Sequence, residues 1–210
     1  MDITETSEEL AATFADQVPD LVFATGPASY TYQFGSRGVL DPLIRASWLV
    51  PGTLFSHDAT TLALRGGELL GIEIGFTDPG FHARADALAP IWPDPADLDE
   101  ADRGHLRGIG RRLHQCRWLN PAIPPDVYYI HALAVTDAHR GTGVGAALLR
   151  QALERAQRSG MDGLQLDVLS DNPAVDFYLA NGLEVLVESK APIPFANGVP
   201  TELRMGIRFR

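Results

Sequence analysis

Residues 128–146 read Tyr128-Tyr129-Ile130-His131-Ala132-Leu133-Ala134-Val135, then Thr136-Asp137-Ala138-His139, then Arg140-Gly141-Thr142-Gly143-Val144-Gly145-Ala146. The first eight residues are an extended apolar run, and the last seven form a glycine-rich turn that opens a predicted helix. Such a turn leaves several backbone N–H groups unpaired at the positive end of the helix dipole. A pyrophosphate binds well to this arrangement. The stretch therefore predicts a strand, an anion-binding turn and a helix, and with them a phosphorylated cofactor.

Two other kinds of phosphate-binding turn fit this stretch less well. A P-loop needs a Lys followed by Ser or Thr at the helix start, whereas the chain has Gly145-Ala146-Ala147. A dinucleotide fingerprint needs G-x-G-x-x-G and an acid about 20 residues later. Gly141, Gly143 and Ala146 give a small-residue version of that spacing, with Asp162 or Asp167 as the acid. The dinucleotide interpretation is thus the main alternative.

A second motif favours a different family. Residues 172–183 read Asn172-Pro173-Ala174-Val175-Asp176-Phe177-Tyr178-Leu179-Ala180-Asn181-Gly182-Leu183 and follow a predicted strand over residues 163–169. The turn and this segment together, in this order and context, resemble the GNAT superfamily of acyl-CoA-dependent N-acyltransferases. The resemblance covers residues 52–79 and 126–209.

The resemblance implies an α/β (α+β) fold: a mixed, mainly antiparallel sheet flanked by helices, with splayed fourth and fifth strands. At 210 residues, one domain over 1–210 is the simplest organisation. We expect N-terminal helices and the first strand in residues 1–50. An insertion in 80–125 is a possible lid over the acceptor site, and 126–190 is the expected acetyl-CoA-binding core.

Local patterns predict the remaining elements. Hydrophobic periodicity and turn residues give helices over 7–18, 39–48 and 97–117, an extended piece over 29–34, a hairpin of 60–64 and 69–76, and final strands over 184–190 and 203–209.

Composition limits the partners and the compartment. The formal net charge is -10 and Lys190 is the only lysine, which disfavours nucleic acid and anionic membranes, although acidity also simply keeps a protein in solution. We see no signal peptide and no apolar run near the ~20 residues that span a bilayer. The single cysteine, Cys116, fits a reducing compartment, so we expect a cytoplasmic protein. No Cys/His spacing indicates a metal.

The GNAT resemblance implies a cofactor site for acetyl-CoA. By resemblance, the backbone of the fourth strand at Leu133, Ala134 and Val135 contacts pantetheine, with the Leu133 N–H near the thioester oxygen. Asn172 is expected to bond to pantetheine or to neighbouring backbone. The pyrophosphate would bind the turn, formed by Arg140, Gly141, Thr142, Gly143, Val144, Gly145 and Ala146.

The resemblance also implies catalytic roles. Tyr178 matches the family tyrosine that faces the cofactor sulfur, so it is the expected general acid. The strand around His131 is similar to that of the serotonin N-acetyltransferases, where the matching histidine takes part in proton removal. An imidazole with a pKa near 6.5 suits that task at neutral pH. Glu73, His57 and water remain open as alternative bases.

The expected function is direct transfer of an acetyl group from acetyl-CoA to a primary amine of a small molecule or peptide in a ternary complex. The alternative is a non-catalytic acyl-CoA-binding or regulatory module. We expect the amine to enter between the helix at 39–48 and the segment at 97–117, where Arg107, Arg111 and Arg112 are candidates to hold a carboxylate. A homodimer is possible.

Overall fold

The computed structural model describes residues 1–77, 80–119 and 122–209, so the predicted insertion is described except at 120–121. One seven-stranded sheet runs in the order β1-β2-β3-β4-β5-β7-β6. Only the β4–β5 pair is parallel among the strand pairs of the described residues. The mixed, mainly antiparallel sheet expected from the sequence is confirmed. Its strands are β1 (Asp2–Glu5), β2 (Thr60–Arg65), β3 (Glu68–Thr77), β4 (Val127–Val135), β5 (Gly163–Leu169), β6 (Glu184–Ser189) and β7 (Glu202–Arg208).

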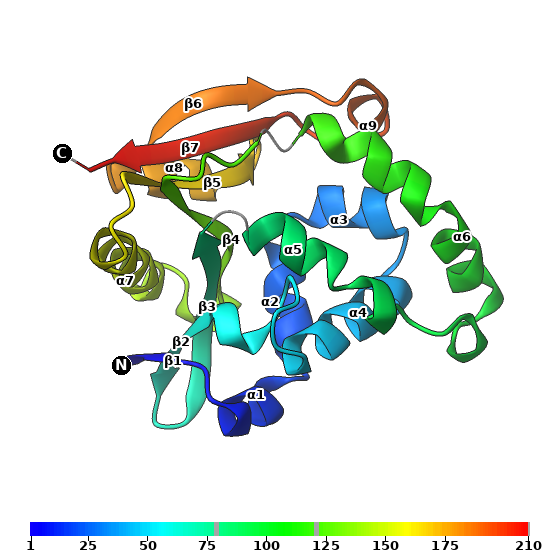
Figure 1. Cartoon of the computed structure of the whole chain (residues 1–210), viewed down its shortest axis with the longest axis horizontal. Helices are drawn as coiled ribbons and strands as arrows, with labels where there is room; N and C mark the ends of the chain where they lie inside the picture. The colour runs from blue at the N-terminus through cyan, green and yellow to red at the C-terminus, as the bar shows by residue number, and fades with distance from the viewer. Residues whose placement is uncertain (78–79, 120–121, 210) are drawn as a thin grey trace.

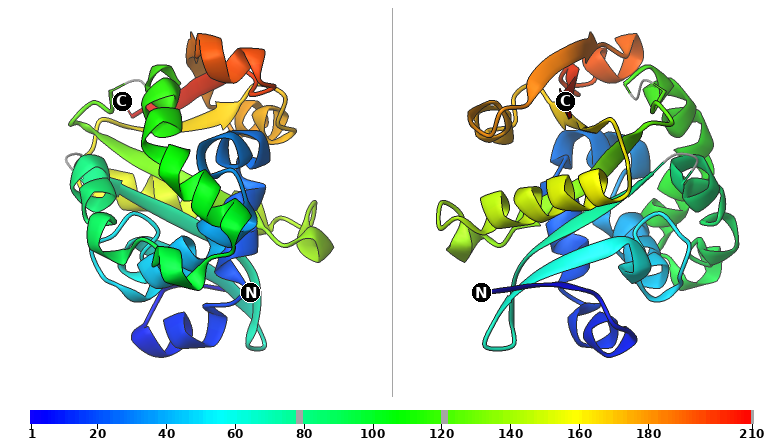
Figure 2. Two further views of the ribbon diagram at one scale, coloured as in Figure 1. Left: turned by 90° about the vertical axis from the view of Figure 1, so that its right-hand side faces the viewer. Right: turned by 60° about the vertical axis from the view of Figure 1, so that its left-hand side comes forward.

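Helices cover both faces of the sheet (Figures 1 and 2). In Figure 1, α7 lies to the left of the strands and α2 to α6 lie to the right. The α-helices are α1 (Glu8–Phe14), α2 (Val18–Ala24), α3 (Pro27–Phe34), α4 (Arg37–Leu49), α5 (Gly80–Asp86), α6 (Glu100–Gln115), α7 (Val144–Arg158), α8 (Ala174–Ala180) and α9 (Pro192–Ala196). Short 3-10 turns include η1 (His57–Ala59), η2 (Ala89–Ile91), η3 (Pro95–Asp97), η4 (Cys116–Trp118) and η5 (Asp137–His139).

The larger hydrophobic core lies between the sheet and the N-terminal helices. Helix α4 contributes Val39, Leu43 and Trp48, all fully buried, and the Trp48 indole donates a hydrogen bond to the Ala11 carbonyl at 2.7 Å. On the other face, Val144 and Leu148 of α7 pack against β2 and β3. The two cores fix both faces of the sheet from which the site is built.

Several sequence predictions are confirmed. The hairpin forms between β2 and β3, and its turn residues Gly66 and Gly67 have φ of +59° and +86°, the positive values of a tight hairpin turn. The helix expected at 39–48 is α4, and the helix expected at 97–117 is α6, capped by Asp99. The two C-terminal strands are β6 and β7.

The prediction of an extended piece at residues 29–34 is wrong, because these residues form helix α3. Pro27 occupies the first turn, and Gly35, with φ of +83°, ends the helix. Tyr30 and Phe34 lie one helical turn apart with ring centroids 6.1 Å apart, as expected for side chains on one face of a helix. The prediction did not use the helix signals at the two ends of this segment.

The N-terminal prediction also needs correction. The first strand is β1, which pairs with β2 from Asp2 opposite Leu64 to Glu5 opposite Thr61. The helix expected over 7–18 ends at Phe14, and Val18 opens α2 instead. Ser7 does cap α1, since its hydroxyl accepts a hydrogen bond from the Leu10 N–H at 3.2 Å.

Strands β4 and β5 separate along their length, as expected. They pair from Val127 opposite Gly163 to Ile130 opposite Leu166, and both strands continue beyond that point. On the other edge of β4, the register with β3 shifts so that His131 is an extra residue between the partners of Ile74 and Gly75. Such a bulge bends a strand and redirects its side chains. The opening between β4 and β5 thus begins at His131.

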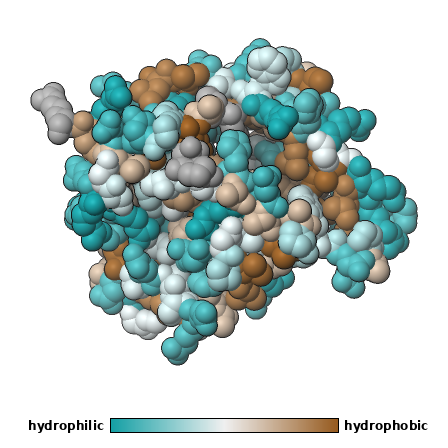
Figure 3. All heavy atoms as spheres, viewed as in Figure 1, coloured by the Kyte–Doolittle hydropathy of each residue, from teal (hydrophilic) through white to brown (hydrophobic). Residues whose placement is uncertain are grey.

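Strand β6, at the edge of the sheet farthest from β1, carries exposed apolar side chains. Val185, Leu186 and Val187 of β6 are 45%, 48% and 44% exposed, and apolar atoms gather at the upper edge of Figure 3 over β6 and α9. Across residues 1–77, 80–119 and 122–209, no helix combines the length and apolar character needed to cross a bilayer.

Candidate active site

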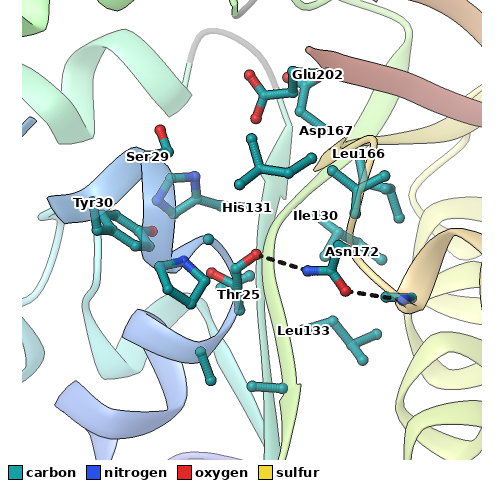
Figure 4. Close-up of a pocket in the computed structure, with 18 of the residues that line it drawn as sticks. Thr25, Ser29, Tyr30, Ile130, His131, Leu133, Leu166, Asp167, Asn172 and Glu202 are labelled. Atoms are coloured by element: carbon teal, nitrogen blue, oxygen red, sulfur yellow. Dashed lines mark hydrogen bonds between the residues drawn. The ribbon is translucent and has the colours of Figure 1, made fainter. Parts of the chain in front are cut away.

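A cavity of about 1160 Å³ runs from the glycine-rich turn, through the opening between β4 and β5, to helix α3. Its walls come from segments far apart in sequence: the α2–α3 connection, α5, β4, β5, the start of α8 and the start of β7. Figure 4 shows side chains from several of these elements around one space.

The turn at one end of the cavity has the geometry of an anion site. Gly141 and Gly143 adopt φ of +74° and +89°, and α7 begins at Val144, so its first N–H groups have no partner inside the helix. Arg140, paired with Asp137 at 2.8 Å, lines the cavity with Gly141, Gly143, Gly145 and Ala146.

The side chains of two residues of the predicted turn are engaged within the protein, and neither residue is among the described residues that line the cavity. The Thr142 hydroxyl donates to the His139 carbonyl at 2.7 Å, and the Val144 side chain is buried beside Leu148. Their side chains therefore hold the turn in shape.

The middle of the cavity has an open strand edge. Leu133, Ala134 and Val135 all line it, at a point where β4 has left its pairing with β5. These residues still pair with β3, but the backbone groups that face β5 have no strand partner, and such an edge suits an extended, amide-rich group such as pantetheine. The residues present therefore fit the predicted cofactor: unpaired backbone for pantetheine and a glycine turn for pyrophosphate.

Asn172 makes bonds to neighbouring backbone. Its amide nitrogen donates to the Thr25 carbonyl at 3.3 Å, and its side-chain oxygen accepts from the Ala174 N–H at 2.9 Å (Figure 4). Asn172 thus ties the end of α2 to the start of α8 while lining the cavity.

Tyr178 lies on α8 and lines the same space while being 5% exposed. Burial raises the pKa of its phenol well above the usual value, so the group remains protonated at neutral pH. A buried phenol of this kind can donate a hydrogen bond to a charge that develops beside it.

His131 also lines the cavity, surrounded by aromatic rings. Its ring centroid lies 5.4 Å from Phe55, 5.9 Å from Phe81 and 6.1 Å from Phe76. Its Nε2 atom is buried and has no hydrogen-bond partner among the described residues. Burial lowers the pKa of this imidazole to about 4, which corrects the value near 6.5 expected from the sequence. The side chain is therefore neutral at physiological pH.

Beyond His131, the wall is held by a buried ionic network. Arg204 contacts both oxygens of Asp167, at 2.5 and 2.7 Å, and the Tyr129 hydroxyl donates to Asp167 at 2.9 Å. The side chains of Arg204 and Asp167 are 3% and 4% exposed. This network positions Tyr129 next to His131, whose ring centroid is 6.5 Å away.

Sequence reasoning missed Glu202, which opens β7 and lines the cavity near Asp167 (Figure 4). Burial, with the negative charge of Asp167, raises the pKa of its carboxyl group to about 8. No motif surrounds Glu202 in the sequence, and only the β5–β7 pairing of Leu169 with Glu202 brings it to the site.

The alternative bases lie elsewhere. The Glu73 carboxylate accepts a hydrogen bond from the Tyr128 hydroxyl at 3.0 Å and lies 4.0 Å from Arg155 of α7, on the other face of the sheet. The His57 ring bonds to the Trp48 carbonyl at 2.7 Å. Neither residue is among the described residues that line the cavity.

The far end of the cavity differs from the expected acceptor entrance. Its walls are residues 24–30 and 33–34, with Phe81, Ala85, Leu88 and Trp92. No described residue of 39–48 lines it, because α4 is packed into the core, and Leu113 is the only described lining residue from 97–117.

The three candidate arginines also lie outside this lining. The Arg112 guanidinium donates to the Gln33 carbonyl at 2.8 Å, which joins α6 to α3. Arg107 pairs with Glu100 at 3.7 Å on the surface. Within the described part of the chain, no group of three or more His, Cys, Asp or Glu side chains has the arrangement of a metal site.

A model of the acetyltransferase (GNAT) family matches residues 54–183, which include the whole of β4, the glycine turn and α8. The chain belongs to this family. The resemblance inferred from the two sequence motifs is thereby confirmed.

Individual relatives are more distant. An uncharacterized N-acetyltransferase of Methanocaldococcus jannaschii is 34% identical over 77 residues, covering 36% of this chain and 34% of that protein. A mycothiol acetyltransferase of Corynebacterium aurimucosum is 29% identical over 102 residues, covering 46% and 33%. The chain thus matches about a third of the length of these curated relatives.

The fold extends over the whole chain. The crystal structure of an N-acetyltransferase from Staphylococcus aureus Mu50 superposes with a TM-score of 0.71 at 14% identity, covering 99% of this chain and 100% of that one. At this identity the likeness concerns the fold, including the N-terminal helices that the family model does not reach.

Proposed function

We propose that this protein is an acetyl-CoA-dependent N-acetyltransferase that acetylates a primary amine of a small molecule or peptide by direct transfer. One observation carries the proposal: a single cavity joins the glycine turn, the open edge of β4, Tyr178 and His131 to a second, aromatic end. A cofactor and an acceptor bound in this cavity at the same time can therefore come into contact, as direct transfer requires.

The chain's own residues supply what the reaction needs. The turn holds the pyrophosphate, and the β4 backbone orients the thioester with the Leu133 N–H near its carbonyl oxygen. The amine nitrogen attacks the thioester carbon and the carbon–sulfur bond breaks. Tyr178, the expected general acid, donates a hydrogen bond to the departing thiolate, which takes up a proton and leaves as the thiol. The proton lost by the amine passes to neutral His131 or to water.

Direct transfer is favoured over an acyl-cysteine route. Cys116 is buried beside Leu119 and Leu169, and it does not appear among the described residues of the cavity wall. Burial raises the pKa of its thiol to about 11, so little of the nucleophilic thiolate exists at neutral pH.

The proposal is tested by following thiol release from acetyl-CoA with a panel of amines. We expect amine-dependent thiol release and a thermal stabilisation by acetyl-CoA of about 2.7 kcal/mol at a hundredfold excess over Kd. Stabilisation without thiol release by any amine would favour the non-catalytic acyl-CoA-binding module. The absence of both effects would refute cofactor binding.

Two substitutions test the catalytic roles. Tyr178→Phe should lower kcat while leaving the acetyl-CoA affinity nearly unchanged, because the phenol acts on charge that develops during the reaction. His131→Ala should remove an acidic limb of the kcat/KM profile near pH 4, the pKa set by burial. An unchanged limb would assign proton removal to another group or to water.

The cytoplasmic location, the absence of nucleic-acid and membrane partners, and the homodimer stay predictions from the sequence. The homodimer is tested by light scattering of the purified protein at micromolar concentration.

A further inference from the structure

The acceptor end of the cavity contains a carboxyl group that the mechanism above does not use. Glu202 lines the cavity, and its Oε2 atom is buried without a hydrogen-bond partner among the described residues. A buried polar atom left unpaired destabilises the folded protein. A carboxyl oxygen without a partner, on a residue that lines a cavity, indicates a group whose partner the protein itself does not supply.

The charges around Glu202 favour a cation as that group. Asp167 lies close enough to raise the pKa of Glu202, and Arg204 lowers it. The Arg204 guanidinium, however, already contacts both oxygens of Asp167 at 2.5 and 2.7 Å. Two buried carboxyl groups therefore share one guanidinium, so a positively charged ligand would stabilise the ionised form of Glu202.

The cavity wall formed by α3 and the segment around Trp92 is mainly apolar. Tyr30 and Phe34 of α3 lie across the cavity, and Trp92 stacks on Phe34 with ring centroids 6.1 Å apart. Figure 4 shows Glu202 and His131 extending from the sheet toward the side on which Ser29 and Tyr30 lie. A small amine with an apolar body would be able to contact these rings and the carboxylate together.

Among the described residues, this end of the cavity has no arginine or lysine to pair with an acceptor carboxylate. Of the arginines and lysines in the described ranges, Arg140 is the one that lines the cavity, and it belongs to the glycine turn at the opposite end. An amino acid would therefore bring its carboxylate close to Glu202 and Asp167 without compensation, which costs binding free energy.

We propose that Glu202 binds the acceptor nitrogen as the ammonium ion that enters the cavity, and that the acceptor is a small primary amine with an apolar body and no carboxylate. The ammonium proton passes to the Glu202 carboxylate or to water, and the neutral nitrogen then attacks the thioester carbon. This inference rests on the proposed function and narrows its substrate class. Glu202 is then a specificity-determining residue that contacts the substrate.

The test is calorimetric titration of the full chain, saturated with coenzyme A, with 2-phenylethylamine. At pH 8.5, above the pKa of about 8 of the Glu202 carboxyl, Glu202→Gln keeps the shape of the side chain and removes its charge, so we expect 2-phenylethylamine to bind about 10- to 100-fold more weakly. Glu184→Gln, which removes an exposed charge on β6, is the matched control and should leave the affinity unchanged. Glu202→Asp keeps the charge and should retain more of the affinity than Glu202→Gln.

A second measurement needs no variant. The wild-type protein should bind L-phenylalanine, which adds a carboxylate, and 2-phenylethanol, which lacks the charge, at least about tenfold more weakly than 2-phenylethylamine. Failure of 2-phenylethylamine to bind, equal binding of the three compounds, or equal binding to wild type and Glu202→Gln would each overturn the inference.

The experiments distinguish a wrong role for Glu202 from a wrong proposed function. If the protein binds coenzyme A and acetylates amino acids in preference to simple amines, the proposed function stands and the role of Glu202 is wrong. If neither coenzyme A nor acetyl-CoA binds, the proposed function itself is refuted.

Discussion

Replacing Arg204 with methionine should strongly destabilise the protein. The Arg204 side chain is 3% exposed and contacts both oxygens of Asp167, the Gln165 side-chain oxygen at 3.1 Å and the Ala122 carbonyl at 3.3 Å. Arg204→Met fills much of the volume but leaves Asp167 buried beside Glu202 with its principal cation removed. Removing one partner of a buried ion pair costs about 3–5 kcal/mol.

That cost converts into a measurable change in Tm. An unfolding entropy of about 2.1 cal/mol/K per residue gives roughly 0.44 kcal/mol/K for 210 residues. The expected decrease in Tm is therefore about 7–11 °C, measured by circular dichroism at pH 7. Arg208→Met is the control on the same strand, since Arg208 is 84% exposed and pairs with Asp126 only at 3.9 Å. Its Tm should change by less than about 2 °C.

A double variant separates the destabilisation caused by the uncompensated Asp167 charge from the destabilisation caused by lost packing. Asp167→Asn combined with Arg204→Met removes the uncompensated carboxylate, so it should recover at least part of the lost stability. Two results would refute the reasoning: a decrease in Tm of less than about 2 °C for Arg204→Met, or a double variant that is no more stable than Arg204→Met alone.

Three further predictions follow from the same structure. Burial raises the pKa of Glu73 from 4.5 to about 7, so wild-type stability should fall as pH rises through this range. Glu73→Gln should remove roughly 2.5 kcal/mol of the fall between pH 5 and pH 8, measured by urea titration, and equal pH dependence in both proteins would contradict this. Gly143→Val should raise the KM for acetyl-CoA at least about tenfold, because valine disfavours the φ of +89° that the turn requires at this position. Gly198 has a similar φ of +88° but lies outside the cavity lining, so Gly198→Val should lower stability without changing this KM. Iodoacetamide at pH 8 should not label native Cys116, and rapid labelling detected by mass spectrometry would contradict its burial.

The sequence alone was sufficient to predict features that depend on residues close together in the sequence. The glycine turn and α7 are contiguous, and their pattern predicts both the helix start and an anion-binding backbone. The β2–β3 hairpin is likewise fixed by two strands and the Gly66-Gly67 turn between them. The family, too, was inferred from two contiguous motifs, because each encodes a local backbone shape.

Some local predictions were wrong. Residues 29–34 were predicted to be extended, but Pro27 and Gly35 provide the ends of a helix, and α3 packs its Phe34 into the core. Strand β1 has weak local signals and forms because β2 offers it an edge to pair with.

Only the tertiary structure decided the chemistry of the far end of the cavity. Glu202 is 71 residues from His131 in sequence, and both line one cavity because β7 pairs with β5 while β4 bends away at its bulge. The same packing surrounds His131 with aromatic rings and lowers its pKa to about 4. Residue type sets an ordinary pKa, whereas the solvation and neighbouring charges that shift it depend on which distant segments the fold brings together.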